Sequence, residues 1–458
     1  MYFFKKCDII TKKSERMKFM KITFMGAGST IFAKNVLGDC LLCDSIRNDI
    51  EIALYDIDAK RLDDSDQLVC ALNKKYNEGK ATVKSYCGVE NRREALRGAD
   101  FVINAVQIGG YEPSTVIDFE IPKKYGLRQT IADTLGIGGI FRALRTIPVM
   151  QDFATDIEAV CPDAWLLNYT NPMAMLSNYM QRYTNVKTVG LCHSVQVCTD
   201  HLFKLLGMSK DDGIIEKVAG INHMAWLLEV TDKDGNDLYP EIRRRAIAKN
   251  DSEKHGDMVR YEYIRRLGYY CTESSEHNAE YNPFFIKGRY PELIEKFNIP
   301  LDEYPRRCIK QIGDWEKQRE EIFAGGDVTH KRSLEYGSRI IEAMVTNTPY
   351  KIGGNVLNTG LITNLPQNAT VEVPCLVDAN GITPTVVGDL PLQLAAMNSS
   401  NIYPQLLAVE AAVLKDREKL YQAAMMDPHT AAELSIDDIV AMCDEMLEAH
   451  AKSGFPCL

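Results

Sequence analysis

The stretch KFMKITFMGAGSTIFAKNVLGDCLL, near the start of the chain, constrains the fold more than any other segment. Residues 20–25 form an apolar run of strand length, and Gly26 and Gly28 bracket a tight turn after it. Apolar residues then recur with helical spacing. This order is typical of a dinucleotide-binding unit, in which Gly26 permits the turn and Gly28 lets the backbone approach a pyrophosphate. The hydroxyls of Ser29 and Thr30 and the helix N-terminus favour its negative charge.

The next apolar run, in IEIALYDIDAKRL, ends in two acidic residues, Asp56 and Asp58. A parallel second strand has to deliver a carboxylate to the ribose hydroxyls, and Asp56 is in that position, whereas Asp58 suits the N-cap of the following helix. An acid at this place favours NAD over NADP. Further strands, in ADFVINAVQIGG and AWLLNYTNP, alternate with helical stretches. The first 190 residues or so therefore predict an α/β fold with a doubly wound parallel sheet of the Rossmann type.

Polar residues follow the ends of these strands and of a further apolar run in VGLCHSVQ, where ligands bind in such sheets, and one more lies in the loop TIADTLGIGGI. They include Asn104, predicted to contact the cofactor, together with Asp133, Asn171, Cys192 and His193. Each also has a simpler interpretation as a turn or cap residue. The pattern predicts where a site lies but not its chemistry.

Composition excludes several classes of protein. The chain has 53 basic and 63 acidic residues, a net charge of -10 and no basic patch, so we expect neither nucleic acid nor a membrane surface as partner. No apolar run reaches transmembrane length. The 13 cysteines show no disulfide spacing and indicate a reducing, cytoplasmic location. Residues 1–19 have only short apolar pieces and are interpreted as an extension.

A set of motifs spread from Met20 to the C-terminus resembles glycoside hydrolase family 4, most closely its bacterial alpha-galactosidase branch. The motifs are MGAGSTIFAKNVLGD, VQIGGYEPSTV, QTIADTLGIGGIFRALRTIP, NYTNPMAM, GLCHSVQ, AGINHMAW, YYCTESSEHNAEY, NLPQNATVEVPCLVDANGI and MMDPHTA. The resemblance implies a fold similar to lactate and malate dehydrogenases. It also implies two cofactors, NAD and a divalent metal, usually Mn2+. This NAD-dependent family is an exception to the two-carboxylate rule of glycosidases.

The resemblance implies that Cys192 and His223 are the metal ligands. Spacing alone would not show this, because two candidate ligands 31 residues apart are weak evidence of a site. A metal with two protein ligands keeps positions open for the O2 and O3 atoms of a sugar. In the implied reaction NAD+ takes hydride from C3, a base removes the C2 proton, and the C1 substituent is eliminated. Water then adds and the hydride returns, so NAD is not consumed.

The resemblance assigns the other roles less evenly. Asn171 matches a sugar-binding asparagine, and Asp133 matches an acidic position expected to support the base. His193 stands where phospho-glucosidase members have an aspartate acid, and an imidazole is also able to protonate a leaving oxygen. For the base, which is a tyrosine in several members, Tyr263 lies nearest to the matching position without coinciding with it. The alternatives are Tyr261, Tyr269 and Tyr270, with Glu273, Glu276 and His277 as equal candidates for substrate contact.

Strand and helix alternation loosens after about Ser209. We therefore predict a NAD-binding domain at 20–200 and an α+β domain for substrate binding and oligomerisation at 201–458. The family implies a homodimer or homotetramer. The predicted function is hydrolysis of alpha-D-galactosides such as melibiose.

Several alternatives to this function stay open. Within the family they are alpha-glucosidase, alpha-glucuronidase and alpha-galacturonidase, and Arg142 or Arg145 offers a partner for a phosphate or uronate. Outside it they are a 2-hydroxy acid dehydrogenase-like oxidoreductase and a noncatalytic NAD-binding sensor.

Overall fold

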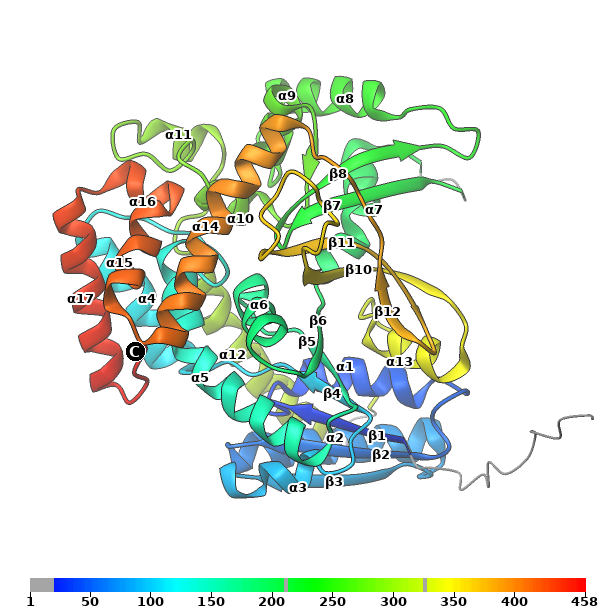
Figure 1. The fold of residues 1–458 in the computed structure, drawn as a ribbon. Coiled ribbons are helices and arrows are strands. Elements are labelled where there is room, and N and C mark those ends of the chain that lie inside the picture. Colours follow the sequence, from blue (N-terminus) through cyan, green and yellow to red (C-terminus); the bar gives the residue numbers. More distant parts are fainter. Residues whose placement is uncertain (1–19, 210–212, 324–327) are drawn as a thin grey trace, which may run out of the picture.

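The computed structural model describes residues 20–209, 213–323 and 328–458, so the predicted extension at 1–19 lies outside the described residues. Twelve strands form one sheet with the order β3-β2-β1-β4-β5-β6-β10-β11-β7-β8-β9, and β12 pairs with β11 (Figure 1). The strands are β1 (Met20–Met25), β2 (Ile50–Asp56), β3 (Thr82–Cys87), β4 (Phe101–Asn104), β5 (Trp165–Asn168), β6 (Lys187–Gly190), β7 (Ile215–Ile221), β8 (Met224–Thr231), β9 (Tyr270–Cys271), β10 (Tyr350–Leu357), β11 (Thr370–Asp378) and β12 (Gly381–Pro384).

Helices cover both faces of this sheet. They are α1 (Thr30–Leu41), α2 (Ala59–Asn77), α3 (Arg92–Leu96), α4 (Val116–Lys124), α5 (Gly136–Val160), α6 (Met173–Tyr183), α7 (His193–Leu206), α8 (Tyr239–Ser252), α9 (Met258–Leu267), α10 (Ser275–Glu280), α11 (Glu292–Lys296), α12 (Glu303–Phe323), α13 (Gly337–Thr346), α14 (Leu392–Leu414), α15 (Arg417–Met426), α16 (Pro428–Glu433) and α17 (Ile436–Lys452).

The first six strands, β1 to β6, are all parallel, as the sequence predicts. Their side chains alternate between the two faces: Phe101 and Ile103 of β4 join the core with α1 and α2, and Val102 between them joins the core with α3, α5 and α6. Because both faces are covered, most residues of the inner strands β1, β4 and β5 are apolar and buried. The Rossmann-type prediction is confirmed.

The second half of the chain continues the same sheet in the antiparallel direction. Strand β10 pairs with β6 at Asn355 and Gly190, and β11 then connects β10 to the β7–β8 hairpin. The predicted boundary at residue 200 falls inside α7. All three hydrophobic cores of the described ranges contain residues from before and after that boundary, so the two halves are joined by backbone pairing and by packing.

The C-terminal helices return to the first half of the chain. Figure 1 shows α14 to α17, in orange and red, beside α4 and α5, and the apolar residues of α14, α15 and α17 share a core with α5 and α6. The segment 404–426, which reads as one amphipathic helix in the sequence, is divided between α14 and α15. Lys415 has a left-handed φ of 53°, and the Asp416 carboxylate caps α15 by accepting from the backbone N–H of Glu418 and Lys419.

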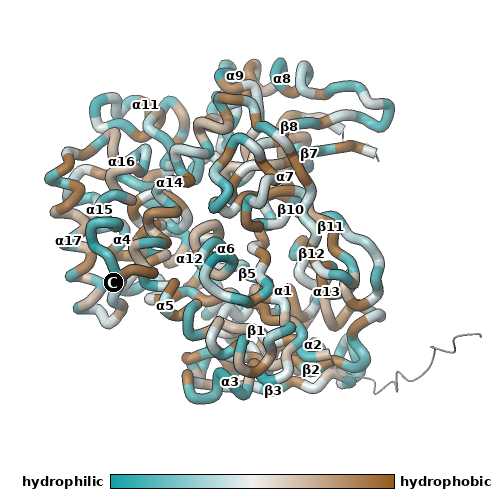
Figure 2. Tube along the Cα trace, viewed as in Figure 1, coloured by the Kyte–Doolittle hydropathy of each residue, from teal (hydrophilic) through white to brown (hydrophobic). Residues whose placement is uncertain are grey.

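Polar and apolar residues alternate along the outer helices. In Figure 2, α17 carries both colours, and its apolar side faces the core. None of the helices in the described ranges combines the length and the apolarity that a membrane crossing requires. The cysteines of the described ranges are all free thiols.

Candidate active site

The turn after β1 begins the site. Gly26 has a φ of +87°, and its backbone N–H and that of Ala27 each donate to the carbonyl of Tyr55 at 2.9 Å. A Cβ on Gly26 would lie 2.9 Å from the backbone of Ala105, so only glycine fits this turn. The predicted role of Gly26 therefore has a steric basis in the contact between the turn and the end of β4.

The Asp56 carboxylate lies directly beside Gly28. Its Oδ2 accepts from the backbone N–H of Gly28 at 2.6 Å, and its Oδ1 accepts from that of Asp58 at 2.9 Å. A Cβ on Gly28 would be 2.8 Å from Oδ2, so the lack of a side chain there makes room for Asp56. Asp58 caps α2 by accepting from Lys60 and Arg61, as the sequence predicts.

The other three residues predicted to bind the cofactor lie in different environments. Ser29 lines the cavity that opens beyond β1. Thr30 is buried behind the turn, where its hydroxyl accepts from Ser65 at 3.0 Å. Asn104 is fully buried and donates to Asn168 Oδ1 at 2.9 Å, so it joins the ends of β4 and β5. Thr30 and Asn104 therefore support the nucleotide-facing loops from behind, because their side chains point into the protein.

A cavity of about 370 Å³ lies beyond the carboxyl ends of β1, β4, β5 and β6. Segments far apart in the sequence line it. They contribute Ser29, Phe32, Ala105, Val106, Gln107, Asp133, Arg142, Tyr169, Thr170, Asn171, Met173, Leu191, Cys192, His193, His223, Glu273, His277, Tyr304 and Glu335. Asn171, Cys192 and His193 are brought together because the parallel strands β5 and β6 end at one edge of the sheet. Asp133 reaches the cavity from the loop before α5, and His223 from the turn of the antiparallel β7–β8 hairpin.

Cys192, His223 and Glu273 form a compact group within the cavity. Their ligand atoms all lie within 4.8 Å of one another. Cys192 is the N-cap residue of α7, and His223 lies in the turn between β7 and β8. A thiolate, an imidazole and a carboxylate at this spacing are a donor set that a divalent transition metal accepts.

Burial and neighbouring charges set the ionisation of this group. Burial lowers the pKa of His223, which favours the neutral imidazole that binds metals. Burial alone would raise the pKa of Glu273, but His223, His277 and His193 outweigh it and lower the pKa to about 2. Burial raises the pKa of Cys192 well above its ordinary value, so a thiolate there needs a cation beside it.

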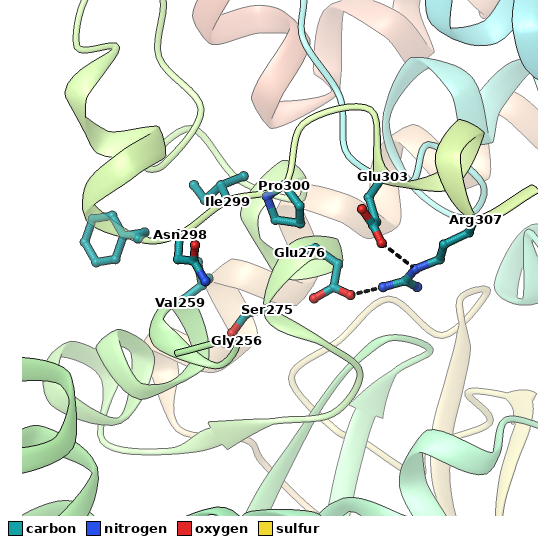
Figure 3. Close-up of a pocket in the computed structure, with 10 residues that line it drawn as sticks. Gly256, Val259, Ser275, Glu276, Asn298, Ile299, Pro300, Glu303 and Arg307 are labelled. Atoms are coloured by element: carbon teal, nitrogen blue, oxygen red, sulfur yellow. Dashed lines mark hydrogen bonds and ion pairs between the residues drawn. The ribbon is translucent and has the colours of Figure 1, made fainter. Parts of the chain in front are cut away.

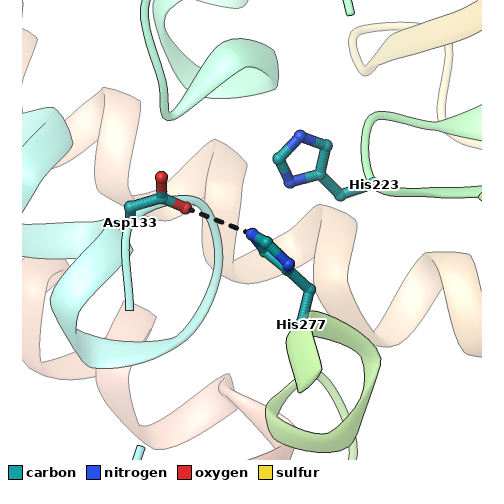
Figure 4. Close-up of side chains that lie close together, drawn as sticks. All are labelled: Asp133, His223 and His277. Atoms are coloured by element: carbon teal, nitrogen blue, oxygen red, sulfur yellow. Dashed lines mark ion pairs between the residues drawn. The ribbon is translucent and has the colours of Figure 1, made fainter. Parts of the chain in front are cut away.

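Asp133 and His277 form an ion pair close to His223 (Figure 4). His277 Nε2 lies 3.9 Å from Asp133 Oδ1, and its Nδ1 is 2.7 Å from the hydroxyl of Ser274. The loop before Asp133 is held by Glu280, whose carboxylate accepts from the backbone N–H of Thr130 at 2.7 Å and also from the two residues that follow. An imidazole positioned by a carboxylate is a common arrangement for moving a proton.

Comparisons with known proteins identify the family. The model of the family 4 glycosyl hydrolases matches residues 21–208, and that of the family 4 glycosyl hydrolase C-terminal domain matches residues 218–430. The chain belongs to glycosyl hydrolase family 4. An alpha-galactosidase of Bacillus subtilis (strain 168) is 65% identical over 94% of this chain and 98% of its own length. An alpha-galactosidase of Rhizobium meliloti (strain 1021) is 34% identical over 95% and 89%.

Solved structures of 6-phospho-glucosidases have the same fold as this family 4 chain. A 6-phospho-alpha-glucosidase from gut microorganisms, in complex with NAD and Mn2+, superimposes with a TM-score of 0.78 at 22% identity, covering 95% of this chain and 99% of that one. A 6-phospho-beta glucosidase from Thermotoga maritima, with NAD and glucose-6-phosphate, gives 0.75 at 21% identity and the same coverage.

The four tyrosines predicted as candidates for the base are not among the residues that line the cavity. Tyr263, the best aligned, is 2% exposed; its hydroxyl donates to the Asn278 carbonyl at 3.0 Å and accepts from Asn282 at 2.6 Å. Burial raises its pKa well above the ordinary value. Tyr261 and Tyr270 are fully buried in another core. Tyr263 therefore does not face the cavity in this structure, because α9 turns it into the protein interior.

The alternatives in the TESSEH segment divide between two cavities. Glu273 and His277 face the main cavity, whereas Glu276 lies in a second cavity of about 280 Å³ (Figure 3). There Glu276 pairs with Arg307, which also pairs with Glu303. Every charged group that lines this second cavity is therefore neutralised by a neighbour, and we assign no chemistry to it.

Two cavity residues, Tyr304 and Glu335, gave no signal in the sequence. Tyr304 lies in the first turn of α12, and Glu335 precedes α13. Glu335 has a buried carboxylate oxygen without a hydrogen-bond partner, and burial raises its pKa despite the nearby His193. Their place depends on how segments after residue 300 pack on the first sheet strands, which local patterns do not encode.

Proposed function

We propose that this family 4 chain is an alpha-galactosidase that acts with NAD and a divalent cation, Mn2+. The observation that carries the proposal is the convergence of Cys192 and His223 on one cavity beside the glycine turn of β1. The names of the two relatives described above support the galactoside as substrate. If Cys192 and His223 occurred in the sequence by chance, there would be no reason for their side chains to meet in one cavity.

The residues present fit both cofactors. The Gly26 turn and the Asp56 carboxylate would hold the pyrophosphate and the adenosine ribose of NAD, and Cys192 and His223 would hold the cation. When bound, NAD supplies a reversible hydride acceptor and Mn2+ a Lewis acid, which together acidify the proton next to an oxidised sugar carbon. Ser29 lines the cavity at the helix N-terminus, where backbone N–H groups favour a phosphate.

The remaining side chains of the cavity would act on the sugar and its protons. The Asn171 amide can both donate to and accept from sugar hydroxyls. His277 is placed to remove a proton at Nε2, with Asp133 holding the resulting imidazolium and Ser274 fixing the other ring nitrogen. His193, at the first position of α7, faces the same cavity and stays our candidate for protonating the leaving oxygen.

The decisive assay is hydrolysis of p-nitrophenyl alpha-galactoside in deuterated water, with NAD+, Mn2+ and thiol each omitted in turn. We expect hydrolysis only when all three are present, deuterium at C2 of the product, and no net release of NADH. Net NADH release would indicate the 2-hydroxy acid dehydrogenase-like alternative. Hydrolysis that is indifferent to NAD+ would refute the mechanism.

One observation favours a second substrate, an alpha-galacturonide. Arg142 is 7% exposed and lines the cavity, and its hydrogen-bond partner there is the hydroxyl of Tyr304, at 3.4 Å. No carboxylate of the described ranges lies within salt-bridge distance of it, whereas Arg145 pairs with buried Asp118. An alpha-galacturonidase of Thermoanaerobacter italicus is 28% identical over 95% of this chain. Comparing kcat/KM for galactoside and galacturonide separates the two, and we expect the galactoside to be preferred.

We also propose a homodimer or homotetramer in the cytoplasm. A reducing compartment would keep Cys192 available as a ligand. Light scattering of the full chain measures the oligomeric state, and a monomeric mass would contradict this part of the proposal.

A further inference from the structure

Glu273 is held close to the two predicted metal ligands by a small set of backbone contacts. Thr272 donates its N–H to the carbonyl of Ala225 at 2.7 Å and accepts from the N–H of Ala225 at 3.1 Å through its hydroxyl. The residue before Glu273 is thereby fixed to the strand that begins just after His223. Glu273 Oε2 lies 3.4 Å from His223 Nε2 as a result.

Both His223 and Glu273 have strained backbone conformations. Each has a φ of 64°, in the left-handed region that residues with a Cβ rarely adopt. Such a conformation costs about 1–3 kcal/mol and persists only where the surrounding structure enforces it, most often at functional sites. The ligand atoms of these two strained residues and Cys192 Sγ all lie within 4.8 Å of one another.

The chemistry of the three groups suits one cation. A thiolate and a carboxylate neutralise a 2+ ion, and Mn2+ prefers carboxylate oxygen among protein donors. A second group, made of Asp133, His223 and His277, also has ligand atoms within 4.8 Å of one another (Figure 4). A neutral imidazole has one lone pair, so His223 binds an ion with one group or with the other but not with both.

The contacts of His223 and His277 favour the group with Cys192. The Nδ1 of His223 lies 3.3 Å from the hydroxyl of Tyr281, which leaves its Nε2 toward Glu273. His277 Nδ1 lies 2.7 Å from the Ser274 hydroxyl and 3.6 Å from Glu273 Oε1, and its Nε2, to which the proposed function assigns the proton, lies 3.9 Å from Asp133 Oδ1. We propose that Glu273 is a third protein ligand of the cation, with Cys192 and His223, and that Asp133 and His277 stay outside its coordination shell. This inference rests on the proposed function, which places a cation in the cavity.

The test is metal binding by the full chain without sugar. Binding is measured from the decrease in the electron paramagnetic resonance signal of free Mn2+. Losing even an outer-shell partner of a metal costs about 10–100-fold in affinity. We expect Glu273→Gln, which keeps the size of the side chain, to weaken Mn2+ binding by at least about 100-fold. The matched control, Asp133→Asn, removes the acid of the competing group and should change the affinity by less than about 3-fold, under 1 kcal/mol.

A second readout separates the failure of this inference from that of the proposed function. Co2+ bound to a thiolate gives a near-ultraviolet charge-transfer band, which we expect in the wild type and not in Cys192→Ser. Absence of the band and of Mn2+ binding in the wild type would refute the metal site itself. An intact band with unchanged Mn2+ affinity in Glu273→Gln, or a loss of affinity in Asp133→Asn, would refute the role of Glu273 alone. Glu273→Asp, which keeps the charge, should restore part of the affinity and shows that the loss is not due to misfolding.

Discussion

Replacing Gly28 by alanine tests the nucleotide-binding half of the site. The added Cβ would lie 2.8 Å from Asp56 Oδ2, against an ordinary contact of at least 3.4 Å, so the carboxylate has to retreat by about 0.6 Å. This movement breaks the 2.6 Å hydrogen bond from the Gly28 N–H. A hydrogen bond to a charged group is worth about 1.5–3 kcal/mol. If that energy is lost from the NAD complex, NAD+ binds about 10–100-fold more weakly.

Isothermal titration of NAD+ into the two proteins measures this change. Gly256 provides a matched control, because its φ is not positive and nothing lies within 4 Å of an added Cβ. We expect Gly256→Ala to bind NAD+ as the wild type does. A folded Gly28→Ala variant with unchanged affinity would show that Asp56 does not hold the ribose.

Four further substitutions test the site and the fold. Tyr263→Phe should keep kcat within about 3-fold, whereas His277→Asn should lower it about 10²–10⁴-fold in a steady-state assay; the reverse order would restore a tyrosine as the base. Burial raises the pKa of Glu280 from 4.5 to about 7, so its contribution to stability is complete below pH 4.5 and is lost as the pH rises towards 7. Glu280→Gln should remove that decline, worth up to about 3 kcal/mol, from urea midpoints measured across this range; an unchanged slope would contradict it. Gly313→Ala, in the middle of α12 with nothing near its added Cβ, should raise the free energy of unfolding by about 0.5–1 kcal/mol, and a lower urea midpoint would argue against a regular helix there.

The first half of the fold was predictable because its signals are local. Apolar runs of strand length, the Gly26 turn and helical spacing each depend on a few neighbouring residues. Parallel topology then brings the strand ends together, so Cys192 and Asn171 were expected near the turn before any contact was known. Asn104 shows the limit of this reasoning, because a polar strand end can also face a neighbouring strand, as it does with Asn168.

The second half of the site was not predictable from local patterns. Glu273 reaches the cavity because Thr272 pairs with Ala225, a contact between residues 47 positions apart. Tyr263 was misplaced for a related reason: several tyrosines are close in the sequence, and only the packing of α9 against Trp226 and Phe285 determines which way this one points. The direction in which each of these side chains points depends on long-range packing, which the periodicity of the sequence does not describe.

The pairing of β6 with β10 has a consequence for how the chain unfolds. Separating the two halves would break the hydrogen bonds between β6 and β10 and expose the two larger hydrophobic cores to solvent. We therefore expect that neither half unfolds independently of the other. We expect one cooperative denaturation step for the whole chain, and an insoluble product when expression is stopped at residue 200. Any motion that admits a sugar must then come from loops at the rim of the cavity, since the strands beneath it belong to one continuous sheet.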